Sequence, residues 1–147
     1  MPFFESQSRE QLRQMYLEAW QRRRAGSPLE PLQAQIAAVI ELHPEYHAAL
    51  ENPEVLARDY TPQQGQSNPF LHMGLHLAVR DQLATDRPAG IKALFDGIAR
   101  RDGSLHTAEH RLIECLAETL WEAQRAGLPP DEQAYLMRVS RIPHTAP

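Results

Sequence analysis

The chain has 147 residues, of which 42% are hydrophobic and 23% charged, and its formal net charge is −4. These values suit one globular domain over residues 1–147, and the negative charge argues against non-specific nucleic-acid binding. No apolar run of about 18 residues could cross a membrane, no signal peptide opens the chain, and the single cysteine, Cys115, favours a reducing compartment. We therefore expect a soluble cytoplasmic protein with neither nucleic acid nor membrane among its partners.

Apolar residues recur at helical spacing along most of the chain, and no alternating run is long enough to predict a strand. Capping residues, glycines and prolines mark the expected ends of six helices. These helices are expected over residues 9–25, from Pro31 onward, over residues 69–84 and 88–102, between Ser104 and Gly127, and after Pro130. Residues 51–68 are expected to form a long loop, and residues 142–147 a frayed tail. The predicted fold is all-α: an antiparallel bundle of four principal helices with shorter helices packed against it.

Three local features of these helices carry specific expectations. Ser8 is predicted to cap the first helix. Pro44 either kinks the second helix or restarts one with His43 at its cap. The fifth helix has apolar residues around much of its circumference, so we expect it to be central and largely buried. Both tryptophans, Trp20 and Trp121, are expected in the core.

Six of the seven histidines fall into pairs with identical His-x-x-x-His spacing: His43/His47, His72/His76 and His106/His110. Random placement would give about a third of one such pair. Residues four apart on an α-helix lie one above the other, about 6 Å along the axis, so both imidazoles can reach one metal ion. Because each buried imidazole needs partners for two nitrogens, six of them on apolar stripes indicate a metal site.

Carboxylates near the pairs are further candidates. Glu114 lies four residues after His110 and extends that helix face, which suits a mixed nitrogen–oxygen site; a solvated or outer role is the alternative. Asp81 is a weaker candidate. Glu45 and Glu109 lie off the line of their flanking histidines, and a hydrogen bond to imidazole or plain solvation suits them better.

The segment His-Thr-Ala-Glu-His at residues 106–110 also matches the inverted zincin pattern, in which the glutamate is the general base of a metallopeptidase. This pattern is short, and it would leave the other two histidine pairs unexplained. We therefore keep a zinc-dependent hydrolase, with Glu109 or Glu114 as base, as an alternative to the leading hypothesis.

Longer motifs occur at residues 43–47 (His-Pro-Glu-Tyr-His), 68–76 (Asn-Pro-Phe-Leu-His-Met-Gly-Leu-His), 108–110 (Ala-Glu-His) and 120–125 (Leu-Trp-Glu-Ala-Gln-Arg). Through them, nearly the whole chain resembles a family of small bacterial proteins labelled domain of unknown function 1841, which implies no activity. A looser architectural similarity is to haemerythrin-like and DinB-like helical bundles, which implies a metal held between helices. The order of the motifs and the third histidine pair depart from haemerythrin.

The leading hypothesis is a mono- or dinuclear non-haem metal site, with iron favoured and zinc or manganese as alternatives. The predicted ligands are His43, His47, His72, His76, His106, His110 and Glu114. Such a site suits redox catalysis or the sensing of oxygen, peroxide or nitric oxide. A third hypothesis is a protein-interaction module whose metal only holds the helices together, and a homodimer is left open.

Overall fold

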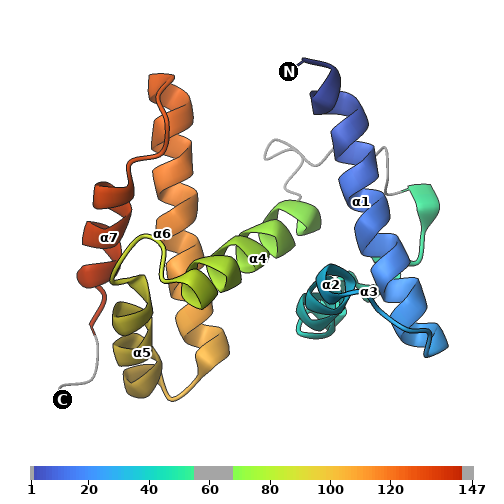
Figure 1. Cartoon of the computed structure of the whole chain (residues 1–147), viewed down its shortest axis with the longest axis horizontal. Helices are drawn as coiled ribbons and strands as arrows, with labels where there is room; N and C mark the ends of the chain where they lie inside the picture. The colour runs from blue at the N-terminus through green and yellow to red at the C-terminus, as the bar shows by residue number, and fades with distance from the viewer. Residues whose placement is uncertain (1, 55–67, 144–147) are drawn as a thin grey trace. The chain divides into compact units, whose positions relative to one another are not determined.

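The computed structural model describes residues 2–54 and 68–143, and within these ranges the regular structure is entirely helical. The elements are α1 (Pro2–Ala25), α2 (Pro31–Glu41), the 3₁₀ turn η1 (Pro44–Tyr46), α3 (His47–Leu50), α4 (Pro69–Thr85), α5 (Ile91–Asp102), α6 (Leu105–Ala126) and α7 (Glu132–Ser140) (Figure 1). The all-α prediction is confirmed, whereas the antiparallel four-helix arrangement stays a prediction. Most of the expected loop and tail, residues 55–67 and 144–147, lies outside the described residues.

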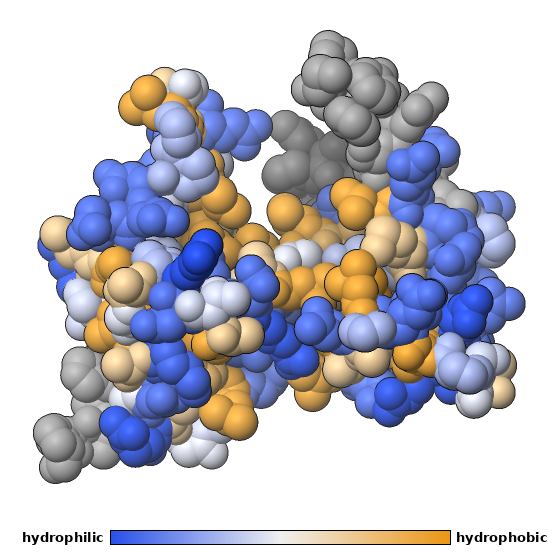
Figure 2. All heavy atoms as spheres, in the orientation of Figure 1, coloured by the Kyte–Doolittle hydropathy of each residue, from blue (hydrophilic) through white to orange (hydrophobic). Residues whose placement is uncertain are grey.

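The chain divides into two compact units, Met1–Gly74 and Leu75–Pro147, and the boundary falls inside helix α4. Unit 1 holds α1, α2, η1, α3 and the first turns of α4. Unit 2 holds the rest of α4 together with α5, α6 and α7. Hydrophilic side chains cover much of the surface visible in Figure 2. No helix among the described residues is long and apolar enough to span a membrane.

In unit 1, helix α1 packs against α2 and α3. Their buried apolar side chains are Tyr16, Ala19, Trp20, Ile36, Ala37, Val39, Ile40 and Leu50. Two arginines in the last turn of α1 make ion pairs, Arg23 with Glu41 and Arg24 with Glu51, each at 2.7 Å. These pairs are partly exposed, so burial of the apolar stripe, not charge pairing, is what chiefly stabilises this packing.

The core of unit 2 is formed by residues from all four of its helices: Val79, Ile91, Phe95, Ile98, Ala108, Leu112, Ile113, Leu116, Tyr135 and Val139. The long helix α6 contributes one stripe to this core. On the opposite face Trp121 is 56% exposed, and Leu105, the first residue of the helix, is 69% exposed. The expectation of a largely buried fifth helix with Trp121 in the core is therefore wrong. The guanidinium of Arg125 lies over the Trp121 ring, 4.6 Å from the ring centroid, and covers part of this exposed apolar surface.

Several helix ends follow the local sequence. Asn68 accepts hydrogen bonds from the backbone N–H groups of Phe70 and Leu71 and so caps α4. Gly103 and Gly127 follow α5 and α6 with φ of 69° and 67°, the left-handed conformation that glycine adopts without strain. The predicted cap at Ser8 is wrong, because α1 already begins at Pro2.

The cap of α6 offers a direct test of local stability. The Ser104 hydroxyl accepts a hydrogen bond from the backbone N–H of Thr107 at 3.2 Å. Ser104→Ala should lower the free energy of unfolding by about 1 kcal/mol, because the N–H loses its partner. Urea unfolding followed by circular dichroism measures this loss. The matched change Ser27→Ala, at an exposed serine outside any helix, should alter stability by less than about 0.5 kcal/mol; equal losses in both variants would contradict the capping role.

Candidate metal centre

Three histidines meet in unit 2, one from α4 and two from α6. His76 is fully buried, and its Nε2 lies 3.0 Å from the Nε2 of His110. The ring of His106 lies 4.3 Å from that of His110 and 5.7 Å from that of His76, between centroids. Helix packing is what assembles this group, because Val79 on α4 and Ala108 and Leu112 on α6 belong to the same core.

A buried carboxylate holds the other side of the His76 ring. Glu109 Oε1 accepts a hydrogen bond from His76 Nδ1 at 2.6 Å and a second from Arg80 Nε at 2.9 Å. Burial by itself would raise the pKa of Glu109, but the hydrogen bonds from His76 and Arg80 outweigh it and hold that pKa below its usual range. The expected hydrogen bond from imidazole to this glutamate is therefore present.

This contact determines which nitrogen of His76 can bind a cation. A carboxylate only accepts hydrogen bonds, so the Nδ1 of His76 must carry the hydrogen. In the neutral ring the lone pair then lies on Nε2, the atom that faces His110.

In unit 1, the end of α2 and the start of α4 bring His43 and His72 together, with ring centroids 5.0 Å apart. His43 is buried and donates from Nδ1 to the backbone oxygen of Val39 at 2.8 Å, so its Nε2 carries the lone pair. Tyr46 stacks on His43, with nearly parallel rings whose centroids are 5.3 Å apart. The ring of His43 is thus held in one orientation by a hydrogen bond and by packing.

His47 makes a different set of contacts. Its Nε2 donates to the backbone oxygen of Ile40 at 2.9 Å, near the end of α2, and its ring packs on Trp20 with 4.3 Å between centroids. Of the two alternatives for Pro44, the restart occurs: α2 ends at Glu41 and His43 precedes the 3₁₀ turn. His43 and His47 therefore do not share one continuous helix. The Ile40 carbonyl also accepts from the backbone N–H of His43 at 3.0 Å, so the Nε2 of His47 adds a second hydrogen bond at this helix end.

Within unit 2, the predicted ligands His76 and His110 offer two neighbouring ring nitrogens that could hold a metal ion. Within unit 1, His43 and His72 lie together. The ligand roles of His47, His106 and Glu114 stay predictions. The side chains of Glu114 and Asp81 are exposed.

Sequence reasoning overlooked Arg80 and Tyr46. Arg80 follows His76 by four residues, and this spacing on one helix face could have indicated a partner for a buried acid beside the histidine. Tyr46 lies inside the first His-x-x-x-His motif, where an aromatic neighbour of the ligands was visible but its stacking on His43 was not.

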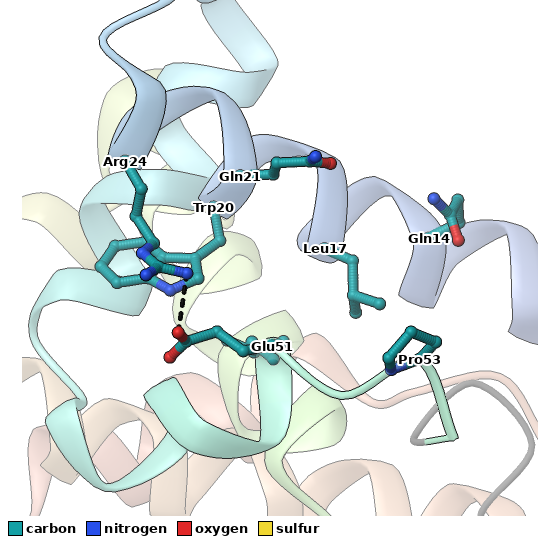
Figure 3. Close-up of a pocket in the computed structure, with 8 residues that line it drawn as sticks. Gln14, Leu17, Trp20, Gln21, Arg24, Glu51 and Pro53 are labelled. Atoms are coloured by element: carbon teal, nitrogen blue, oxygen red, sulfur yellow. Dashed lines mark ion pairs between the residues drawn. The ribbon is translucent and has the colours of Figure 1, made fainter.

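A separate hollow of about 330 Å³ lies on unit 1 between α1 and the segment after α3 (Figure 3). Its lining is Gln14, Leu17, Trp20, Gln21, Arg24, Leu50, Glu51 and Pro53. The Arg24–Glu51 ion pair crosses it, and no histidine lines it. Its polar lining consists of two glutamine amides and this ion pair, so its chemistry differs from that of the histidine groups.

Fold and site together define an all-α protein with a histidine cluster that could hold a metal ion. The chain belongs to the family described as domain of unknown function (DUF1841), whose model matches residues 8–141 and so spans both units. No curated protein and no solved structure matches the chain. The looser similarity to haemerythrin-like bundles has no support from these comparisons.

Proposed function

We propose that this protein binds one divalent transition-metal ion in unit 2, with the Nε2 atoms of His76 and His110 among its ligands. His43 and His72 of unit 1 stay predicted ligands. The observation that carries the proposal is the 3.0 Å separation between the Nε2 atoms of His76 and His110. Two nitrogens bound to one ion at about 2.1 Å lie about 3.0 Å apart when their angle at the metal is 90° and about 3.4 Å apart when it is tetrahedral. In this structure the contact has the length of a hydrogen bond, and an ion could replace its hydrogen with little movement of either ring.

The fixed ring orientations support the same proposal. His76 and His43 each donate from Nδ1 to an oxygen, of a carboxylate and of a backbone carbonyl respectively. Histidine ligands in metal sites commonly donate their second ring nitrogen in this way, which fixes the tautomer and directs the remaining lone pair at the ion. Rings of this kind lose little side-chain entropy when an ion binds.

The donor set bears on the choice of metal. Imidazole nitrogen suits iron, zinc, copper and nickel, whereas manganese and magnesium prefer oxygen. A zinc ion with four protein ligands would be saturated, while a six-coordinate ferrous ion with the same number of ligands would keep two exchangeable positions. We favour iron with open positions, because imidazole ligands without a cysteine suit such a site. The proposed role is redox chemistry or the sensing of oxygen, peroxide or nitric oxide.

The zinc-hydrolase alternative receives less support. Of its two candidate bases, Glu114 has an exposed side chain, whereas Glu109 is buried and its Oε1 already accepts from His76 and Arg80. A base must reach a water molecule on the metal, whereas the Glu109 carboxylate is hydrogen-bonded to the proposed ligand His76. The interaction module with a structural metal is the outcome expected if the bound ion proves saturated.

Metal uptake is tested by titrating the chelator-treated protein with ferrous, zinc and cupric ions in separate anaerobic calorimetric experiments. One ion should bind per chain, and the double variant His76→Ala/His110→Ala should lose it because both Nε2 donors of the close pair are gone. Glu118→Gln, at an exposed position of the same helix α6, should bind as the wild type does. Uptake that survives the double variant would overturn the assigned site, and a second ion lost only in His106→Ala would make the site dinuclear.

The open coordination positions are tested on the ferrous protein. Nitric oxide added without oxygen should produce a new visible absorption band and an altered electron-resonance signal, since the gas needs an exchangeable position on the iron. A protein that takes up zinc alone, with no exchangeable water on the ion, would overturn the redox proposal in favour of the structural role.

A further inference from the structure

We infer that Glu109 is a positioning residue for the metal, one that holds His76 in its binding orientation rather than touching substrate or ion. This inference rests on the proposed function and deepens it, because it assigns to the glutamate of the 106–110 motif a role other than that of a catalytic base. Every contact that carries it lies within unit 2.

The first step is the arrangement of donors around one oxygen. Oε1 of Glu109 accepts from His76 Nδ1 at 2.6 Å and from Arg80 Nε at 2.9 Å. Both donors come from helix α4, one turn apart, while the acceptor comes from α6. A short, charge-assisted hydrogen bond of this kind is about twice as strong as a neutral one, so the imidazole cannot rotate freely about its side-chain bonds.

The second step is what this does to the opposite ring nitrogen. With Nδ1 protonated and hydrogen-bonded to an anion, electron density shifts toward Nε2 and makes it a stronger donor to a cation. That nitrogen is the one 3.0 Å from His110 Nε2. Glu109 immediately precedes His110 in the chain, so a single turn of α6 carries both a metal ligand and the carboxylate that orients His76 on α4.

The third step concerns charge. The His76 side chain is fully buried and that of Glu109 is 8% exposed, so an anion here needs a compensating cation. Arg80 supplies it, and its own side chain is 34% exposed, which lets the rest of the guanidinium stay hydrated. The ion pair with Arg80 therefore holds the carboxylate beside His76, and its hydrogen bond to the Nδ1 of that ring is present before any ion binds.

The test compares Glu109→Gln and Glu109→Leu with the wild type and with the exposed control Glu118→Gln. The first variant keeps an oxygen acceptor and loses the charge; the second loses both. Ferrous or zinc affinity should fall about 10- to 100-fold in Glu109→Leu and by less in Glu109→Gln. In the metal-free proteins, nitrogen-15 spectra of the histidine rings should show His76 protonated on Nδ1 in the wild type, and a mixture of tautomers in Glu109→Leu. Helical circular dichroism establishes that each variant is folded.

The outcomes separate this inference from the proposed function. A wild-type chain that takes up no metal overturns the proposed function. Uptake by the wild type with a dissociation constant in Glu109→Leu within twofold of it overturns only the role of Glu109. A His76 tautomer that is the same in wild type and Glu109→Leu also overturns that role, and this measurement needs no metal. A folded Glu109→Gln whose affinity lies between those of the wild type and Glu109→Leu supports the inference, because this variant keeps the oxygen acceptor and loses only the charge.

Discussion

Removing the metal with a chelator should lower the melting temperature by roughly 10 °C. An ion that binds only the folded chain stabilises it by mass action, and a metal concentration of about 1,000 times the dissociation constant contributes about 4 kcal/mol. In a chain of this size, each kcal/mol shifts the melting temperature by about 2–4 °C. Thermal unfolding followed by circular dichroism, with and without chelator, measures the difference.

The same measurement on His76→Ala/His110→Ala serves as the control, since a chain without the close Nε2 pair should melt at one temperature with or without chelator. Zinc or ferrous iron should restore the wild-type melting temperature, and magnesium should not, because it requires oxygen ligands. If metal-free and metal-loaded wild type melt together, any bound ion is adventitious, and the buried histidines are satisfied by hydrogen bonds alone.

The second large effect concerns the core of unit 2. Leu112 is fully buried on α6 and belongs to the cluster that also contains Val79 of α4. Leu112→Ala should lower the free energy of unfolding by about 2–5 kcal/mol, because apolar contacts are lost and a cavity remains. Urea unfolding measures the change. Leu105→Ala on the same helix, at a position 69% exposed, should cost less than about 0.5 kcal/mol. Comparable losses in the two variants would contradict the assigned core.

The core variant also bears on the metal site. Leu112 lies two residues after His110, and the core to which it belongs holds α4 against α6 where His76 meets that histidine. A cavity at this place should let the two helices shift, and metal affinity should fall together with stability. An exposed variant such as Leu105→Ala changes neither, so the pair of variants relates packing to ligand geometry.

Much of the helical structure could be predicted because its signals are local. A hydroxyl before an apolar run predicts the start of α6, and the glycines after α5 and α6 adopt the left-handed conformation expected at helix ends. The three His-x-x-x-His pairs are equally visible, since the spacing alone indicates two imidazoles on one face. Where the pattern was ambiguous, at Pro44, the sequence named both alternatives but could not choose, because the choice depends on what the following turn packs against.

Tertiary structure decided which partner each histidine has. His47 lies at the right spacing from His43, yet its Nε2 donates to the Ile40 carbonyl, because the break at Pro44 turns the ring back toward the end of α2. Helix α6 carries apolar residues on several faces, but only the face that meets the other helices of unit 2 is buried, and Trp121 is exposed. The contact of Glu109 with His76 joins residues 33 apart in the chain. Sequence by itself determined the helices and the candidate ligands; contacts of this length depend on how whole helices pack, which no local spacing encodes.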